Sequence, residues 1–212
     1  MRLRLWLRLA IVPVLVGCQD LAAPLNQDDV ADPQFGVATW STGVHILQQA
    51  PTAPPLETYQ VSFWARKDKA STVIVNYRPV VEESTGQPFL RFHIPEGGLQ
   101  TGPDRRRLAR RDSVFITLTI DRNNFSVDFQ PSGVGFSKRR PASLAIWYGN
   151  ANQDLNGDGV VDATDQTLAE QLAFWVRNAN PAPWLRTSST TETGPQWVSS
   201  ALFHFSEYAV SW

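Results

Sequence analysis

The 212-residue sequence contains a single cysteine, Cys18, so no disulfide can form within one chain. Its three histidines, His45, His93 and His204, lie far apart in the sequence, and neither an HExxH nor a GxSxG pattern occurs. Charged residues make up only 18% of the chain and nearly cancel, to a formal net charge of −1, which gives no indication of a nucleic-acid partner. These absences predict a non-enzymatic protein that is stabilised by core packing.

The amino-terminal segment carries three arginines within its first eight residues, ahead of and within a run rich in Leu, Ile and Val. This pattern is typical of a signal peptide, and the run is shorter than the roughly 18–20 residues that span a bilayer. A short membrane anchor that happens to contain a cysteine is the alternative. The run ends in Leu15-Val16-Gly17-Cys18, which resembles the bacterial lipobox. The resemblance implies cleavage after Gly17 and attachment of membrane lipid to Cys18.

The same resemblance implies an exported protein of the bacterial cell envelope, and Gln19 after the cysteine favours the outer membrane, because the Asp of an inner-membrane retention signal is missing. Loss of residues 1–17 removes three arginines and no acid, so the formal net charge changes from −1 to −4. Residues 18–35 are rich in Ala, Pro, Asn and Asp and lack periodicity, which predicts a lipidated flexible tether. We expect one folded domain over residues 36–212.

The body of that domain alternates apolar and polar residues with a period of two, the pattern of half-buried strands. Many short strands separated by turn residues predict a mainly β fold, an antiparallel β-sandwich. The turn Asp121–Asn124 joins two of them into a hairpin, and a further strand is possible at Val37–Leu47. The alternating apolar residues are Tyr59, Val61 and Phe63; Val73, Val75 and Tyr77; Leu90, Phe92 and Ile94; Val114, Ile116, Leu118 and Ile120; Phe125, Val127 and Phe129; and Leu144, Ile146 and Tyr148, with final strands at Leu202–Phe205 and Tyr208–Trp212.

The segment Asp154–Asp165 places oxygen donors at the spacing of an EF-hand calcium loop. Gly159 falls at the sixth position, where the chain turns sharply. Four carboxylates in one short loop repel each other unless a cation is present, so metal binding would order the segment. The alternative is an acidic turn that only caps a helix. The predicted calcium ligands are Asp154, Asn156, Asp158, the carbonyl of Val160, Asp162 and Asp165.

Because the loop ends in Asp165 rather than Glu, it resembles the calcium loops of dockerins. A helix over Asp162–Asn178 is predicted to follow, capped by Asp162, with Leu168, Leu172, Trp175 and Val176 on one face. A dockerin has two such loops and this chain has one, so the resemblance does not extend to cohesin binding.

The closing sequence from Phe203 to Trp212 resembles the last strand of the ZU-type β-sandwich found in netrin receptors and ankyrins. This resemblance implies that the calcium loop and helix, at about residues 150–180, are an insertion before the final strands. It also implies that the protein binds a partner rather than catalysing a reaction.

Two function classes follow from these patterns. The first is a calcium-stabilised binding or adhesion lipoprotein whose partner is a protein or a cell-envelope component. The second is a carbohydrate-binding or glycan-processing lipoprotein, with exposed tryptophans and acids such as Glu82 and Glu83 along a groove. We expect most tryptophans to pack in the core and Trp184, beside Pro183, to be the exposed ligand-binding exception. We interpret the basic clusters at 105–111 and 138–140 as solvated loops.

Overall fold

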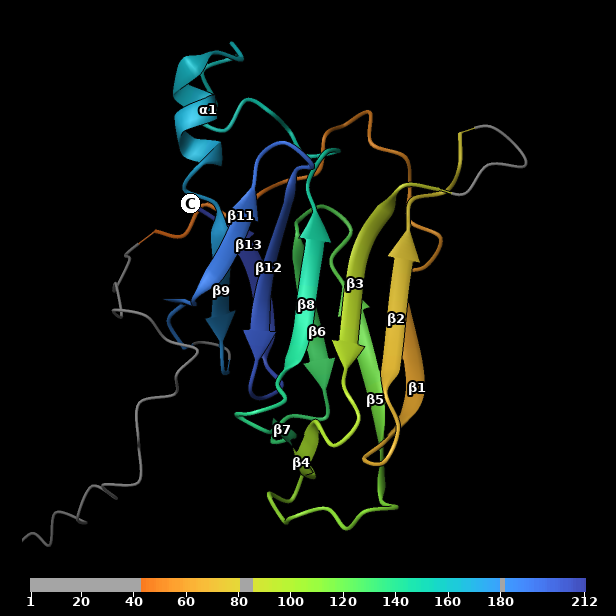
Figure 1. Cartoon of the computed structure of the whole chain (residues 1–212). Coiled ribbons are helices and arrows are strands. Elements are labelled where there is room, and N and C mark those ends of the chain that lie inside the picture. Colours follow the sequence, from red (N-terminus) through yellow and green to blue (C-terminus); the bar gives the residue numbers. More distant parts are fainter. Residues whose placement is uncertain (1–42, 81–85, 180–181) are drawn as a thin grey trace, which may run out of the picture. The chain divides into compact units, whose positions relative to one another are not determined.

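A computed structural model describes residues 43–80, 86–179 and 182–212 of the chain. These residues form strands joined by short turns, together with a single helix near the end of the sequence (Figure 1). The elements are β1 (Gln60–Arg66), β2 (Ser71–Asn76), β3 (Pro88–Ile94), β4 (Leu99–Thr101), β5 (Ser113–Ile120), β6 (Ser126–Gln130), β7 (Gly135–Phe136), β8 (Ala142–Trp147), α1 (Ala163–Ala169), β9 (Ala173–Arg177), β10 (Leu185–Arg186), β11 (Ser189–Glu192), β12 (Trp197–Leu202) and β13 (Glu207–Ser211).

The strands form two large antiparallel sheets that lie face to face (Figure 1). One sheet has six strands in the order β1-β5-β6-β13-β9-β10, and the other has five in the order β11-β12-β8-β3-β2. The short pair β4-β7 closes one end of the sandwich, and α1 stands at the opposite end (Figure 1). The prediction of a mainly β, antiparallel sandwich with one helix is confirmed.

The period-two alternation explains why these segments become strands with one buried face. In β5 the apolar residues Val114, Ile116, Leu118 and Ile120 are all buried, while the residues between them face outward. The predicted hairpin is present as well, since β5 pairs with β6 and the register joins Ile120 to Val127. Its turn is held by the Asp121 carboxylate, which accepts hydrogen bonds from two backbone N–H groups at 2.7 and 2.8 Å.

Phenylalanine rings join the two sheets in the centre of the sandwich. Phe92 of β3 lies 4.9 Å from Phe129 of β6, measured between ring centroids, and Phe129 stacks on Phe205 at 5.1 Å. All three rings are buried. Because burial of one such side chain contributes about 1.5–3 kcal/mol, this cluster fixes how the sheets face each other.

The predicted helix over Asp162–Asn178 is wrong in its second half. The helix α1 ends at Ala169, and the residues from Ala173 to Arg177 form β9, which pairs with β13 on one side and β10 on the other. Phe174 and Val176 enter the core from one face of this strand, and Trp175, only 5% exposed, lies on the other. A sequence that is apolar on both faces is compatible with a central strand as well as with a buried helix. Residues 173–177 form a strand because they pair with β13.

The predicted strand at Val37–Leu47 lies partly outside the described residues, which begin at Gly43. Its described part forms an isolated bridge, Ile46 opposite Ser211, instead of a continuous strand, and a second isolated bridge follows it, Gln48 opposite Asn124. Between them Leu47 donates its backbone N–H to Val210 O at 2.9 Å and accepts one from Phe125 N at 2.9 Å. The segment therefore docks between β13 and the start of β6.

Candidate functional site

The predicted calcium loop, Asp154–Asp165, lies between β8 and α1 at one end of the sandwich (Figure 1). Asp154 accepts three backbone N–H groups from the turn that follows it. Its Oδ1 accepts from Gly157 N at 2.8 Å and Asp158 N at 3.1 Å, and its Oδ2 accepts from Gly159 N at 2.9 Å. Gly157 and Gly159 have φ angles of +75° and +86°, which side chains disfavour. The loop thus curls around the Asp154 carboxylate.

The next two predicted ligands continue the same pattern. Asn156 Oδ1 accepts from Asp158 N at 2.9 Å, and the Asn156 amide donates to Asp158 Oδ2 at 2.9 Å. Asp158 Oδ1 in turn accepts from Val160 N at 2.8 Å. Both residues are exposed, and together with Asp154 they lie in one hydrogen-bonded turn.

Asp165 ties the loop to the helix. Its side chain is 3% exposed, and its Oδ1 accepts from Leu155 N at 2.7 Å and Asn156 N at 3.2 Å. Its Oδ2 accepts from Asp162 N at 2.9 Å, while Asp162 Oδ1 accepts from Thr164 N at 2.7 Å, so the two acids form a capping box. The beginning and the end of the loop therefore meet at a single carboxylate.

The hydrogen bond from the Asp162 backbone N–H, followed by those from Asn156 and Leu155, lowers the pKa of Asp165 against the opposing effect of burial. A carboxyl whose pKa is lower in the folded state stabilises the fold above its unfolded pKa of about 3.9. That contribution is lost as the pH falls through the folded value.

We therefore expect the melting temperature to fall below about pH 4 in the wild type and to fall less steeply in Asp165→Asn, which does not titrate. Thermal unfolding between pH 2.5 and 7, followed by far-ultraviolet circular dichroism, measures this difference. Asp128→Asn, a substitution of an acid outside the loop, is the control. Parallel pH profiles for the wild type and Asp165→Asn would show that the Asp165 carboxylate does not stabilise the fold.

The donor chemistry of this loop fits calcium, because all six predicted positions offer oxygen and each carboxylate has about four lone-pair sites. The backbone N–H bonds use part of that capacity and hold the side chains in place. Within residues 43–80, 86–179 and 182–212, no three acidic, histidine or cysteine side chains approach closely enough to hold a metal ion. The calcium site therefore stays a prediction.

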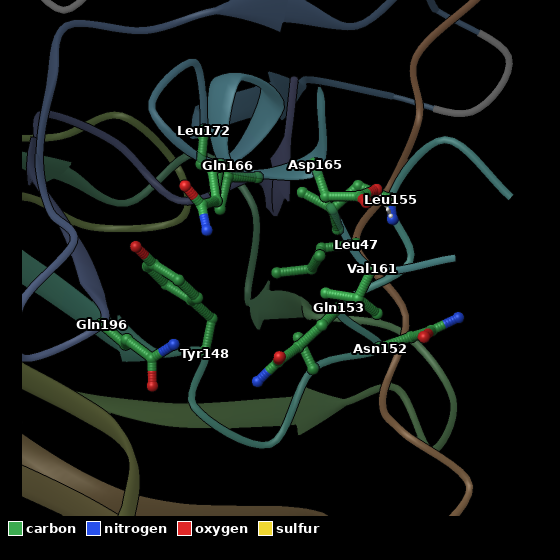
Figure 2. A pocket seen from close by; sticks show the side chains of 12 residues that line it. Leu47, Tyr148, Asn152, Gln153, Leu155, Val161, Asp165, Gln166, Leu172 and Gln196 are labelled. Carbon is green, nitrogen blue, oxygen red and sulfur yellow. Dashed lines mark hydrogen bonds between the residues drawn. The ribbon is translucent and has the colours of Figure 1, made fainter. Parts of the chain in front are cut away.

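A cavity of about 240 Å³ lies beside the loop, between the loop–helix segment and the end of the sandwich (Figure 2). Asp165, Gln166 and Leu155 line it from the loop and helix, and Tyr148 and Leu47 line it from the sandwich. The Tyr148 side chain is 6% exposed, and its hydroxyl has no hydrogen-bond partner among the described residues. A buried polar group without a partner costs about 1–3 kcal/mol. Sequence reasoning assigned Tyr148 to the core and missed this cavity.

The tryptophans are distributed differently from the prediction. Among the described residues only Trp175 is buried, because phenylalanine and aliphatic side chains fill the core. Trp184, predicted as the exposed one, is half-buried: the Arg177 guanidinium lies 4.7 Å over its ring, and Arg177 is itself paired with Glu207 at 2.6 Å. One face of its ring is thus occupied by an arginine of the same chain.

Among the tryptophans that the structure describes, the exposed one is Trp64 in β1, with 65% of its surface accessible. Its ring centroid lies 5.2 Å from that of Phe115, the residue of β5 that pairs with Trp64. Phe115 is itself 47% exposed. Next to them Ser62 Oγ lies 2.8 Å from Thr117 Oγ1. The strand phase indicates this exposure in the sequence, because Trp64 alternates with Val61, Phe63 and Ala65 on the opposite face.

Each of the three histidines contacts a different neighbour. His45 stacks on Trp212 with ring centroids 5.6 Å apart, and His93 Nδ1 lies 2.8 Å from Thr72 Oγ1. His204 Nδ1 lies 3.0 Å from Ser206 Oγ, a buried hydroxyl that also donates to Asn178 Oδ1 at 2.9 Å.

The remaining predicted features are either exposed or outside the described part of the chain. The basic residues at 105–107, 110–111 and 138–140 are exposed on turns. Cys18, Glu82 and Glu83 lie outside the described residues. No helix in the described part of the chain is long and apolar enough to cross a membrane. In comparisons with known proteins, the chain matched no family model, no curated protein and no solved structure.

Proposed function

We propose that this protein is an exported, lipid-anchored binding module, non-enzymatic, whose ligand-contacting end is ordered by calcium. The observation that carries the proposal is the loop Asp154–Asp165, in which Asp165 joins the loop, the helix cap and the wall of the adjacent cavity. Asp154, Asn156, Asp158, Val160, Asp162 and Asp165 would hold the ion. The bound ion would offset two of the four negative charges and leave the loop in one conformation.

The partner, a protein or a cell-envelope component, would meet the loop end of the sandwich. The two packed sheets supply a rigid support, and binding residues on loops above such a support are a common arrangement. Lipid on Cys18 and the tether up to residue 35 would hold the module at the bacterial outer membrane. Calcium sites in extracellular modules bind at about 10⁻⁴–10⁻³ M, so the loop would be occupied outside the cell and empty in the cytosol.

A calcium titration of the full-length protein in detergent tests the proposal. We expect the unfolding free energy to rise with free calcium as RT ln(1 + [Ca]/Kd), by about 2.7 kcal/mol at a hundredfold excess over Kd. Differential scanning calorimetry from excess chelator upward measures the rise. Magnesium is the control, since its smaller, strictly octahedral shell fits a flexible loop poorly. An unchanged melt together with no heat of binding would contradict the proposal and leave the loop as a helix cap.

A second candidate function, carbohydrate binding, is favoured by one specific observation, the exposed pair Trp64 and Phe115 on the outer face of the six-stranded sheet. Exposed aromatic rings stack on the C–H faces of sugars, and the neutral hydroxyls of Ser62 and Thr117 beside them suit sugar hydroxyl groups.

For this candidate we expect Trp64→Ala to lower the affinity of the protein for soluble polysaccharides by about thirtyfold, because loss of a central aromatic anchor costs about 2 kcal/mol. Affinity electrophoresis measures this affinity from the retardation of the protein by the polysaccharide. Ile74→Ala is the matched control, because Ile74 is 55% exposed on the outer face of the other sheet. Equal retardation of both variants and the wild type would contradict the proposal that this face binds carbohydrate.

A further inference from the structure

The cavity beside the calcium loop has walls from two different parts of the fold (Figure 2). Tyr148 and Gln196 belong to the end of the sandwich, whereas Leu155, Asp165 and Gln166 belong to the loop and to α1. In Figure 2 the Tyr148 hydroxyl points toward the side of the cavity on which Gln166 lies. The space is therefore bounded on one side by a rigid sheet end and on the other by the segment that calcium would order.

The Tyr148 phenol supplies the clearest sign of a missing partner. The side chain is more than nine-tenths buried, and its hydroxyl makes no hydrogen bond to any described residue. Burial raises the pKa of Tyr148, so the phenol stays neutral and can both donate and accept. Its backbone N–H donates to Gln196 O at 2.8 Å, and Gln196 has a φ of +53°, which non-glycine residues rarely adopt. Tyr148 and Gln196 are thus fixed at the cavity.

The polar lining is uncharged toward the space. Primary amides of Gln153, Gln166 and Gln196 join the phenol, and no lysine, arginine or histidine is among the described residues that line the cavity. The single carboxylate, Asp165, already accepts backbone N–H bonds through both oxygens. Neutral groups that both donate and accept are complementary to hydroxyl groups rather than to an anion or a cation.

The volume has room for about one ring. About 240 Å³ is less than the roughly 300–1,000 Å³ of sites for drug-sized ligands, and it equals the share of about eight water molecules. Leu47, Leu155 and Leu172 present apolar surface that would cover C–H groups. We propose that this cavity binds one neutral, hydroxyl-bearing ring, a single sugar unit, with the Tyr148 hydroxyl as a direct hydrogen-bond partner.

The inference rests on the proposed function in one respect, because calcium would hold the loop wall of the cavity. Ligand and calcium then favour the same arrangement of the loop, and each strengthens binding of the other by the same factor. This site is separate from the exposed pair at Trp64, which lies on the outer face of the six-stranded sheet.

Saturation-transfer difference NMR on the full-length protein in detergent tests the site, with glucose, galactose and N-acetylglucosamine as probes. Phenol and glucuronate serve as non-sugar and charged comparison probes. We expect at least one neutral sugar to receive saturation, and its Kd to rise about tenfold in Tyr148→Phe, which removes only the hydroxyl. Removal of calcium by a chelator is expected to weaken the binding of the same sugar.

The matched control is Tyr77→Phe, because Tyr77 is 2% exposed and is absent from the cavity lining. This variant also loses one buried hydroxyl, so an equal loss of sugar binding in both variants would overturn the assignment of Tyr148. Sugar binding that is retained in Trp64→Ala and lost in Tyr148→Phe would support the cavity as the sugar site. A second variant, Ala169→Leu, extends a cavity-lining residue of α1 into the space and is expected to block binding.

The outcomes separate this inference from the proposed function. Calcium binding without saturation transfer to any sugar would overturn the assignment of a sugar to the cavity and leave the proposed calcium site standing. Preference for phenol or glucuronate over the neutral sugars would overturn the chemical class. Sugar binding through Tyr148 that is unaffected by calcium or chelator would overturn the coupling and contradict the proposed role of calcium.

Discussion

Replacing Asp154 and Asp158 together by alanine is expected to abolish calcium binding, with no heat detectable by isothermal titration calorimetry at millimolar calcium. Asp154 accepts three backbone N–H groups of the turn and Asp158 accepts one more, so the double variant removes two predicted ligands and the contacts that shape the loop. Loss of even a supporting group costs about 10–100-fold in metal affinity, and loss of two ligands costs more. The calcium-dependent rise in unfolding free energy is expected to vanish with it.

A matched control is Asp121→Ala, which removes a carboxylate that accepts two backbone N–H groups in the hairpin turn between β5 and β6. This variant is expected to lower the melting temperature and to leave calcium affinity unchanged. If the double variant kept its calcium affinity, the ligand assignment would be wrong whatever the stability of the fold.

Substitution of Cys18 by serine is expected to abolish lipid attachment and to reduce the membrane-bound fraction of the protein. The lipobox resemblance places two or more acyl chains on this residue, each buried methylene contributes about 0.8 kcal/mol, and the chain has no second cysteine to replace it. Fractionation of cells that express the wild type and Cys18→Ser, with detection in membrane and soluble fractions, measures the change. Mass spectrometry of the wild-type amino terminus gives a second, independent readout.

The control for this experiment is a conservative change in the tether, Gln19→Asn, which leaves the predicted lipid acceptor in place. It is expected to remain in the membrane fraction. Absence of lipid from the wild-type amino terminus, with residues 1–17 still attached, would indicate an uncleaved anchor instead of a lipoprotein.

The sequence was sufficient for those parts of the fold that depend on local pattern. Strand β5, with Val114 and Ile116 on its inner face, and the hairpin with β6 follow directly from alternation and a turn. The same holds for the helix start, since Asp162 and Asp165 form a capping box at the predicted place. In each case the signal lies within a few neighbouring residues.

The predictions that were wrong concern features that depend on contacts between segments far apart in the sequence. Nothing near Trp175 distinguishes a buried helix face from a strand that pairs with β13, because β13 lies more than thirty residues later in the sequence. The cavity depends on how the loop and the sheet end meet, so Tyr148 looked like an ordinary core residue. The exposure of Trp64 differs from the prediction for another reason: tryptophan has a general preference for the interior, but the phase of Trp64 in β1 places it on the outer face.

The docking of residues 45–47 against the last strand has a mechanical consequence. Ser211 Oγ donates to His45 O at 2.8 Å, Leu47 N donates to Val210 O at 2.9 Å, and His45 stacks on Trp212. A pull on the chain ahead of residue 43 therefore loads β13 first, and β13 is hydrogen-bonded to both β6 and β9 in the middle of the six-stranded sheet. Tension applied ahead of residue 43 would be spread over central strands rather than over an edge strand.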